Sequence, residues 1–200
     1  MIYRVYLASN FLILAALTCG AQQGGAPVAK QATTTPLPLI IQLPGFADGS
    51  KVPIKYTCSA DSAMVSPEIR WSQVPAGTQS FALVFHDLEP HPAKGILDNT
   101  HWVLWNIPGP STGLPEGVPA GSVLPDGTHQ LKRPRTVPAG SPFSYYGPCA
   151  PPGPDHHYVW ELYALDIKLD LPDDAARTDV LKALDGHILG ASTWVGYFHR

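Results

Sequence analysis

The sequence predicts a mainly β domain with one or two helices near its C-terminus. Three observations lead to this prediction. The chain of 200 residues contains 22 prolines and 18 glycines, which favours many turns and short strands over a helical bundle. Its apolar runs are short and regularly separated by turn residues. Only one stretch of the domain shows a helical pattern without internal proline or glycine.

Residues 1–21 have the pattern of a secretory signal peptide. Arg4 supplies the positive charge, residues 5–17 are apolar apart from two polar side chains, and small residues follow. The apolar run is too short for a transmembrane helix, so cleavage after Ala21 is expected. Two alternatives stay open. One is an uncleaved anchor, and the other is a bacterial lipoprotein signal with Cys19 as the lipidated residue, although the three residues before Cys19 match a lipobox poorly.

Residues 22–38 are mostly Gln, Gly, Ala, Thr and Pro, and they lack the apolar surface that folding needs. We therefore expect a flexible linker there, followed by one domain over residues 39–200. The hydrophobic fraction of 44% is enough for a sizeable core. The net charge of −3, without any basic run, argues against a nucleic-acid partner.

Residues 80–86 give the clearest strand signal. Their side chains are apolar on both faces of an extended chain, which indicates a central strand of a sheet. The other expected strands cover residues 39–43, 52–56, 67–71, 101–107, 158–165 and 191–198.

Residues 173–184 form the expected helix. Pro172 could lie at its start, Thr178 could instead cap a shorter helix, and Gly186 would end it.

Two segments are expected to be irregular. Residues 108–142 contain mostly Gly, Pro and Ser without periodicity, and such a long excursion is uncommon unless it is functional or loosely ordered. Residues 145–158 carry four prolines, so they are predicted to form a stiff loop that leads into a strand. A stiff loop of this kind can hold polar groups at the mouth of a pocket, although a surface loop with idle histidines fits its composition equally well.

Two cysteines, Cys58 and Cys149, remain in a cleaved or lipidated product. An even pair in an oxidising compartment predicts a disulfide. Two unrelated buried thiols are the alternative.

Five side chains that donate or accept hydrogen bonds lie where predicted strands begin or end: Asp87, Glu89, His101, His156 and Tyr158. An imidazolium and a phenol can donate to an anion, and Asp87 could accept from a histidine ring and hold it charged. Backbone N–H groups of the stiff loop could add further donors, at Gly147, Cys149 and Ala150.

Several motifs, taken in order, resemble the phosphatidylethanolamine-binding protein family, and most of all its bacterial branch, the Raf kinase inhibitor-like proteins. The main ones are DLE at 87–89, HWVLWNIP at 101–108, YYGPCAPP at 145–152 and HHY at 156–158. Further agreement lies in FADG at 46–49, KYTCS at 55–59, SPEIRW at 66–71, LYALD at 162–166 and GHIL at 186–189. The resemblance covers nearly all of residues 39–200.

The resemblance implies a central antiparallel sheet, a second smaller sheet and peripheral helices. It also implies a small pocket at one end that binds phosphate-like anions or phospholipid headgroups. Matched motif by motif, the ligand-binding residues are Asp87, His101, His156 and Tyr158, beside the turn of Gly147 and Pro148, with Glu89 next to them. Together with the predicted signal peptide, the resemblance leads us to expect an exported binding protein, periplasmic or secreted, rather than an enzyme. It needs no cofactor, it could inhibit a partner kinase or protease, and it meets a membrane only if it is lipidated at Cys19.

Three features depart from the family pattern. Leu88 replaces a proline and Glu89 replaces an aspartate that reaches less far. His157 stands where the family often has arginine, so a fixed charge becomes pH-dependent. Residues 108–142 are longer than the resemblance leads us to expect.

A metal-dependent hydrolase that uses the same pocket is the alternative function. Asp87, Glu89, His101 and His156 are all of metal-ligand types, and a hydrolytic zinc site needs three such ligands. The sequence has no H-E-x-x-H motif and no paired His-x-His, which argues against this alternative.

Overall fold

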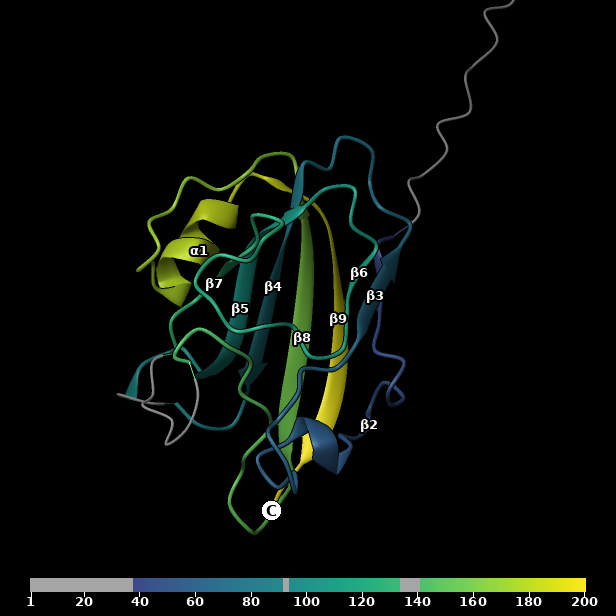
Figure 1. The fold of residues 1–200 in the computed structure, drawn as a ribbon, viewed down its shortest axis with the longest axis vertical. Coiled ribbons are helices and arrows are strands. Elements are labelled where there is room, and N and C mark those ends of the chain that lie inside the picture. Colours follow the sequence, from purple (N-terminus) through teal and green to yellow (C-terminus); the bar gives the residue numbers. More distant parts are fainter. Residues whose placement is uncertain (1–37, 92–93, 134–140) are drawn as a thin grey trace, which may run out of the picture. The chain divides into compact units, whose positions relative to one another are not determined.

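The computed structural model describes residues 38–91, 94–133 and 141–200 (Figure 1). The predicted signal peptide, Cys19 and almost all of the predicted linker lie outside these residues. The described part of the chain forms two β-sheets, one α-helix and one short 3-10 helix.

The larger sheet has six strands in the spatial order β2-β9-β8-β4-β5-β7. Their bounds are β2 Ser50–Lys51, β4 Ser80–Asp87, β5 Asn99–Pro108, β7 His129–Gln130, β8 His156–Leu165 and β9 Ile188–Phe198. Neighbouring strands are antiparallel, except that β2 runs parallel to β9. The predicted antiparallel sheet is therefore present, with one parallel strand at its edge that the sequence did not predict.

The smaller sheet is antiparallel and has the order β1-β3-β6. Its strands are β1 Ile40–Gln42, β3 Ile69–Ser72 and β6 Gly113–Leu114. Its apolar side chains join those of the larger sheet in one buried cluster, so the main core lies between the two sheets.

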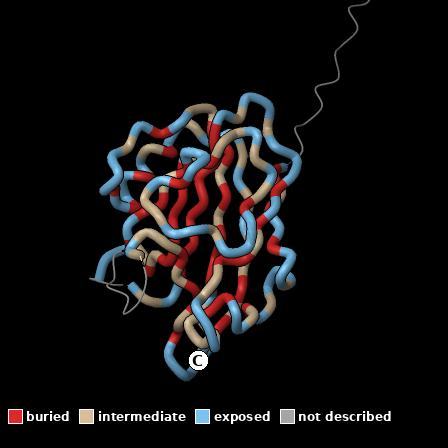
Figure 2. Tube along the Cα trace, in the orientation of Figure 1, coloured by how far each residue is buried: buried red, intermediate tan, exposed pale blue. Residues whose placement is uncertain are grey.

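Strand β4 is buried along its whole length, as predicted for a central strand (Figure 2). Phe81, Leu83 and Phe85 belong to the core between the sheets. Ala82 and Val84 belong to a second cluster, which the helix covers. This two-sided burial is the reason why the strand has no polar face until it reaches its C-terminal end.

The helix α1 (Arg177–Leu184) starts four residues later than predicted. Ala176 is extended, with ψ 164°, and its backbone N–H donates to the Asp179 carboxylate at 2.8 Å. Ala176 is therefore the N-terminal capping position, and the expectation of a cap at Thr178 is wrong. Gly186 follows the helix with φ +81°, a conformation that glycine adopts without strain and that ends a helix.

Residues 52–56 do not form the predicted strand. Val52 still donates its backbone N–H to Tyr197, but Pro53 has no N–H to continue the pairing. The chain turns instead into a 3-10 helix, η1 (Ile54–Tyr56). The alternation of apolar residues was a poor guide here because the proline ended the strand.

The segment 108–142 is less irregular than predicted. It contributes β6 to the smaller sheet and β7 to the larger one, each only two residues long. A two-residue strand leaves no periodicity in a sequence, which explains why neither was predicted. Among the described residues, no helix has the length and apolar character needed to cross a membrane.

An ion network lies under α1, on the helix-covered face of the larger sheet. The Asp98 carboxylate accepts from His86 Nδ1 at 2.6 Å and pairs with the Arg177 guanidinium. His86 Nε2 lies 3.3 Å from a carboxylate oxygen of Glu161. Burial alone would raise the pKa of Asp98, but the hydrogen bonds from Arg177 and His86 hold it below its ordinary value.

Candidate functional site

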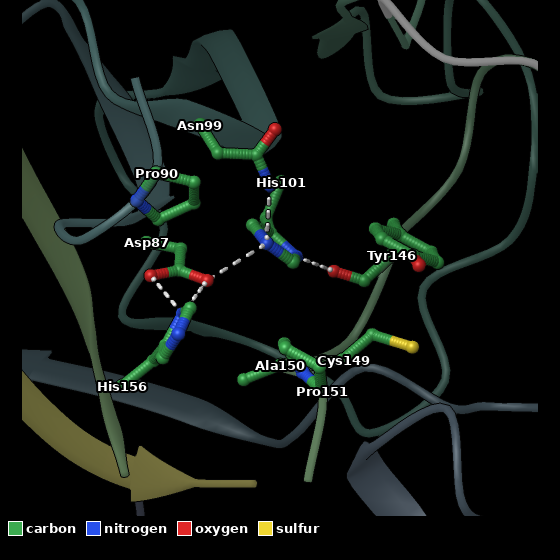
Figure 3. A pocket seen from close by; sticks show the side chains of 9 residues that line it. All are labelled: Asp87, Pro90, Asn99, His101, Tyr146, Cys149, Ala150, Pro151 and His156. Carbon is green, nitrogen blue, oxygen red and sulfur yellow. Dashed lines mark hydrogen bonds and ion pairs between the residues drawn. The ribbon is translucent and has the colours of Figure 1, made fainter. Parts of the chain in front are cut away.

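A small cavity opens where β4 ends and where β5 and β8 begin (Figure 3). Its volume is about 170 Å³. The residues that line it are Asp87, Pro90, Asn99, His101, Tyr146, Cys149, Ala150, Pro151 and His156. Three of the sequence-predicted site residues, Asp87, His101 and His156, therefore share one wall.

Asp87 is the last residue of β4 and is only 3% exposed. His156 Nδ1 lies 3.0 and 2.9 Å from its two carboxylate oxygens, and the backbone N–H of Glu89 donates to it at 3.3 Å. The Tyr158 hydroxyl also interacts with it. Burial nevertheless raises the pKa of Asp87, because these hydrogen bonds only partly replace the water that the carboxylate has lost.

His101 owes its position to an irregularity in β5. The pairing with β4 shifts by one residue here, so that His101 lies at a bulge, and a bulge re-aims side chains. The ring stacks on Tyr146, with centroids 5.1 Å apart. His101 Nε2 lies 4.0 Å from Asp87 Oδ2, which is too far for a hydrogen bond.

Both ring nitrogens of His101 lie at hydrogen-bonding distance from neighbouring groups. Nδ1 lies 2.9 Å from the carbonyl oxygen of Tyr146, which can only accept, so Nδ1 carries the proton. Nε2 lies 2.9 Å from the Asn99 amide nitrogen, from which it accepts.

Glu89 and His157 form a pair outside the cavity wall. Glu89 Oε1 lies 2.5 Å from His157 Nδ1, and Oε2 accepts the backbone N–H of His157 at 2.8 Å. Partial burial would raise the pKa of Glu89, but these bonds lower it below its ordinary value. Both side chains stay substantially exposed.

Tyr158, Gly147 and Pro148 lie behind the wall rather than in it. The Tyr158 hydroxyl accepts the backbone N–H groups of Cys149 at 3.1 Å and Ala150 at 3.0 Å. Two of the three loop donors predicted for an anion are thus already used inside the protein. Burial, and then the charge of Asp87, raise the pKa of Tyr158, so its hydroxyl stays protonated.

The loop that carries Cys149 is fixed to the segment after η1. A Cβ on Gly147 would come within 2.0 Å of the Tyr56 carbonyl oxygen, so only glycine fits there. Cys58 donates its N–H to Pro148 O at 3.0 Å, and Cys58 and Cys149 are joined by a disulfide. One wall of the cavity is therefore held both covalently and by close packing.

Among the polar residues of the wall, sequence reasoning missed Asn99 and Tyr146. Asn99 stands two residues before His101 on the same strand and so shares its face, which is a signal that the sequence does contain. Tyr146 adjoins the Gly147 turn and shows no such pattern. Arg133 contacts the ring of Tyr146, with its guanidinium carbon 5.8 Å from the ring centroid, and is not among the lining residues.

Three side chains at this end could hold a metal ion together. One ligand atom from each of Asp87, Glu89 and His156 lies within 4.8 Å of the others. His101 is not in this group.

Comparison with known proteins identifies the family of the chain. The family model for phosphatidylethanolamine-binding proteins matches residues 42–199. A UPF0098 protein of Methanothermobacter thermautotrophicus is 41% identical over 155 residues, which are 78% of this chain and 95% of the relative. A Mycobacterium tuberculosis protein named as a lipoprotein, LppC, is 33% identical and is aligned over 98% of this chain and 97% of its own length.

Solved structures agree with this match. A phosphatidylethanolamine-binding protein homologue from Chlamydia trachomatis has a TM-score of 0.68 at 26% identity, covering 82% of this chain and 98% of its own. The Escherichia coli protein YbcL also has a TM-score of 0.68, at 22% identity, covering 82% of this chain and 99% of its own, and supports the fold.

Proposed function

The chain belongs to the phosphatidylethanolamine-binding protein family, and we propose that it is an exported binding protein whose cavity holds a small phosphate-like anion. The observation that carries this proposal is the pairing of His156 with the buried carboxylate of Asp87 in the cavity wall. A carboxylate on one ring nitrogen favours the charged imidazole, which can then donate from the other nitrogen.

The size and chemistry of the cavity support a small polar ligand. At about 170 Å³ it is below the range of pockets for drug-sized molecules, so a phosphate group or a lipid headgroup suits it better than acyl chains. His156 Nε2 would give the anion a charge-assisted hydrogen bond. The Asn99 amide, which also lines the cavity, is a second source of donors.

Binding fits the cavity better than catalysis does. Among the described residues that line it, the one sulfur atom, on Cys149, is held in a disulfide and cannot act as a nucleophile. No serine, threonine or lysine is among those lining residues.

The test is calorimetric titration with methyl phosphate, in the presence of a chelator, at pH 5.5 and at pH 8. These values bracket the range in which histidines change charge. His156→Ala removes the charge-assisted donor, so we expect a loss of roughly ten- to a hundredfold in affinity at pH 5.5. The wild type should bind more weakly at pH 8 because the imidazolium form is depleted.

His187→Ala is the matched control. His187 pairs with Asp166 at 2.9 Å, in the same way as His156 pairs with Asp87. It lies just before β9, at the end of the larger sheet opposite to the cavity. This variant should bind as the wild type does. Equal affinity in His156→Ala and wild type, together with no effect of pH, would overturn the proposal. Titration with vesicles of phosphatidylethanolamine then distinguishes a lipid headgroup from a free phosphate ester as the source of the anion.

Export is the second part of the proposal. The relative LppC, named as a lipoprotein, aligns with 98% of this chain, and disulfides persist mainly in oxidising compartments. If Cys19 is lipidated, the wild type should partition into the membrane fraction and Cys19→Ser into the soluble fraction. If the leader is cleaved after Ala21, both should be soluble, and the mature mass should begin at Gln22. Retention of both in the cytoplasm would contradict export.

The cavity has an exposed rim formed by Leu88 and residues 151–154. A partner protein that responds to a bound ligand would contact this rim. Leu88 is 42% exposed beside Asp87, and residues 151–154 are exposed on the opposite wall. A rigid apolar and proline-rich rim suits protein contact.

A further inference from the structure

The cavity has too little positive charge for the anion that we assign to it. Among the described residues that line it there is no lysine or arginine, and both ring nitrogens of His101 are already within hydrogen-bonding distance of Asn99 and Tyr146. The N–H groups of Cys149 and Ala150 donate to the Tyr158 hydroxyl. The charged acid in the wall, Asp87, would repel an anion unless another positive charge stands between them.

The side chains at this point are suited to hold that charge. Asp87, Glu89 and His156 place three ligand atoms within 4.8 Å of one another. Two come from the end of β4 and the loop after it, and one comes from the start of β8, so antiparallel pairing of the two strands fixes their separation. Two carboxylates and one imidazole are ligands for a divalent ion.

The distances fit a shared ion. His156 Nδ1 lies 2.9 and 3.0 Å from the Asp87 oxygens. Two ligand atoms that each bind Zn²⁺ at about 2.1 Å in a tetrahedral site stand about 3.4 Å apart. An ion can therefore replace the hydrogen between the two groups if they separate by roughly half an ångström.

Glu89 is held beside this point by His157. His157 binds both of its carboxylate oxygens, through its ring Nδ1 and its backbone N–H. Each carboxylate oxygen can accept more than one partner, so Glu89 can reach an ion while it keeps these bonds. Carboxylates that bind metals are commonly hydrogen-bonded in this way.

We propose that Asp87, Glu89 and His156 bind one divalent transition-metal ion of the Zn²⁺ class, and that an oxygen of the anion completes its coordination. Imidazole favours transition metals, whereas an all-oxygen set would favour Mg²⁺ or Ca²⁺. Three protein ligands leave at least one position open toward the cavity. The second half of this inference rests on the proposed function, and the first half does not.

The test begins with the metal alone. Calorimetric titration of the full chain with Zn²⁺ should show one site. Glu89→Gln keeps the shape of the side chain and removes its charge, so Zn²⁺ affinity should fall at least about tenfold. Asp166→Asn is the matched control because Asp166 also pairs with an imidazole, that of His187, and is similarly exposed. It should bind Zn²⁺ as the wild type does.

Thermal unfolding verifies that both variants are folded before titration. Glu89 is exposed, so its replacement should leave the fold intact. Absence of stoichiometric Zn²⁺ binding to the wild type would overturn the inference. Equal loss of affinity in Glu89→Gln and Asp166→Asn would also overturn it, because it would show binding to scattered surface histidines.

The anion is tested second, with methyl phosphate added to Zn²⁺-loaded protein and to protein in chelator. Binding at least tenfold tighter with Zn²⁺ supports the bridging ion. Equal binding in both states overturns the bridge and leaves the proposed function standing. If Zn²⁺ binds but methyl phosphate binds in neither state, the metal site stands and the proposed function fails.

Discussion

Two neighbouring residues of β4, His86 and Asp87, point to opposite faces of the sheet, and each belongs to a buried histidine–aspartate pair. On the helix-covered face, His86 pairs with Asp98 at 2.6 Å. On the pocket face, Asp87 pairs with His156 at 2.9 Å. Both carboxylates are largely removed from water, with side chains 12% and 4% exposed.

The difference between the two pairs is one arginine. Arg177 completes the pair on the helix face and holds the pKa of Asp98 below its ordinary value. Among the described residues no arginine or lysine pairs with Asp87, so burial dominates and its pKa is raised. The same two residue types thus make a closed ion network on one face and a site short of positive charge on the other.

The largest expected effect comes from the covalent closure of the pocket face. Replacing both Cys58 and Cys149 by Ser should lower the free energy of unfolding by about 4 kcal/mol, because the disulfide closes a long loop of the unfolded chain. Urea unfolding of the oxidised wild type and the double variant measures this change. Reduced wild type should match the variant; a loss under about 1 kcal/mol would show that packing at Gly147 is sufficient alone.

Arg177→Met should cost about 3 kcal/mol, because it leaves Asp98 buried without its cation. Adding Asp98→Asn should recover most of this loss, since the uncompensated charge is then gone. Lys182→Met, on the exposed side of the same helix, is the control and should change stability by less than about 0.5 kcal/mol. If Arg177→Met resembles that control, the ion network does not stabilise the helix face.

The two aspartates should respond to pH with opposite signs. Asp98 has a lowered pKa, so its contribution to stability is present above the unfolded value, near 3.9, and is lost as pH falls through the folded value. Asp87 has a raised pKa, so its contribution is present below the unfolded value and is lost as pH rises through the folded one.

Asp98→Asn should therefore be less stable than wild type at pH 7 and approach it toward pH 3. The free energy of unfolding of Asp87→Asn should rise relative to that of the wild type as pH rises from about 4 to 7. The sign of each change follows from the direction of the pKa shift. Urea unfolding at pH 3, 5 and 7 measures both variants against the wild type. The same pH dependence in both would show that the two aspartates do not differ in the direction of their pKa shifts.

The smallest effect is expected at a pair that neither face buries. Asp166 and His187 lie 2.9 Å apart with side chains 46% and 39% exposed. Asp166→Asn should change the free energy of unfolding by less than about 0.5 kcal/mol, because water screens the pair. A larger change in the thermal midpoint than in Asp98→Asn would show that burial is not what separates these pairs.

The two-sided strand β4 could be predicted because burial on both faces leaves a continuous apolar run. The position of Asp87 at its end followed, since a polar residue after such a run marks where the strand leaves the core. The sequence placed His156 just before a predicted strand, and the structure shows that this strand starts at His156 and pairs antiparallel with β4.

The partners of these side chains could not be predicted. The bulge that places His101 depends on the pairing of β5 with β4, and pairing between strands leaves no local mark in the sequence. The use of two loop N–H groups by Tyr158 likewise depends on a contact between segments, and so does the arrival of Arg177 beside Asp98. Whether a segment forms a strand or a helix depends largely on its local sequence. The hydrogen bonds and the pKa of a titratable side chain depend on neighbours from other segments.

The parallel pairing of β2 with β9 constrains the order in which the chain can fold. Ser50 lies opposite Gly196, so a strand near the start of the domain can pair only with a strand near its end. Until β9 has been synthesised, β2 has no partner and β8 has an open edge. Contacts of such long sequence separation form slowly because the intervening chain must first be closed into a loop. The domain therefore completes its larger sheet only after its last strand is available, and a chain cut short before residue 188 would expose the edge of β8 to aggregation.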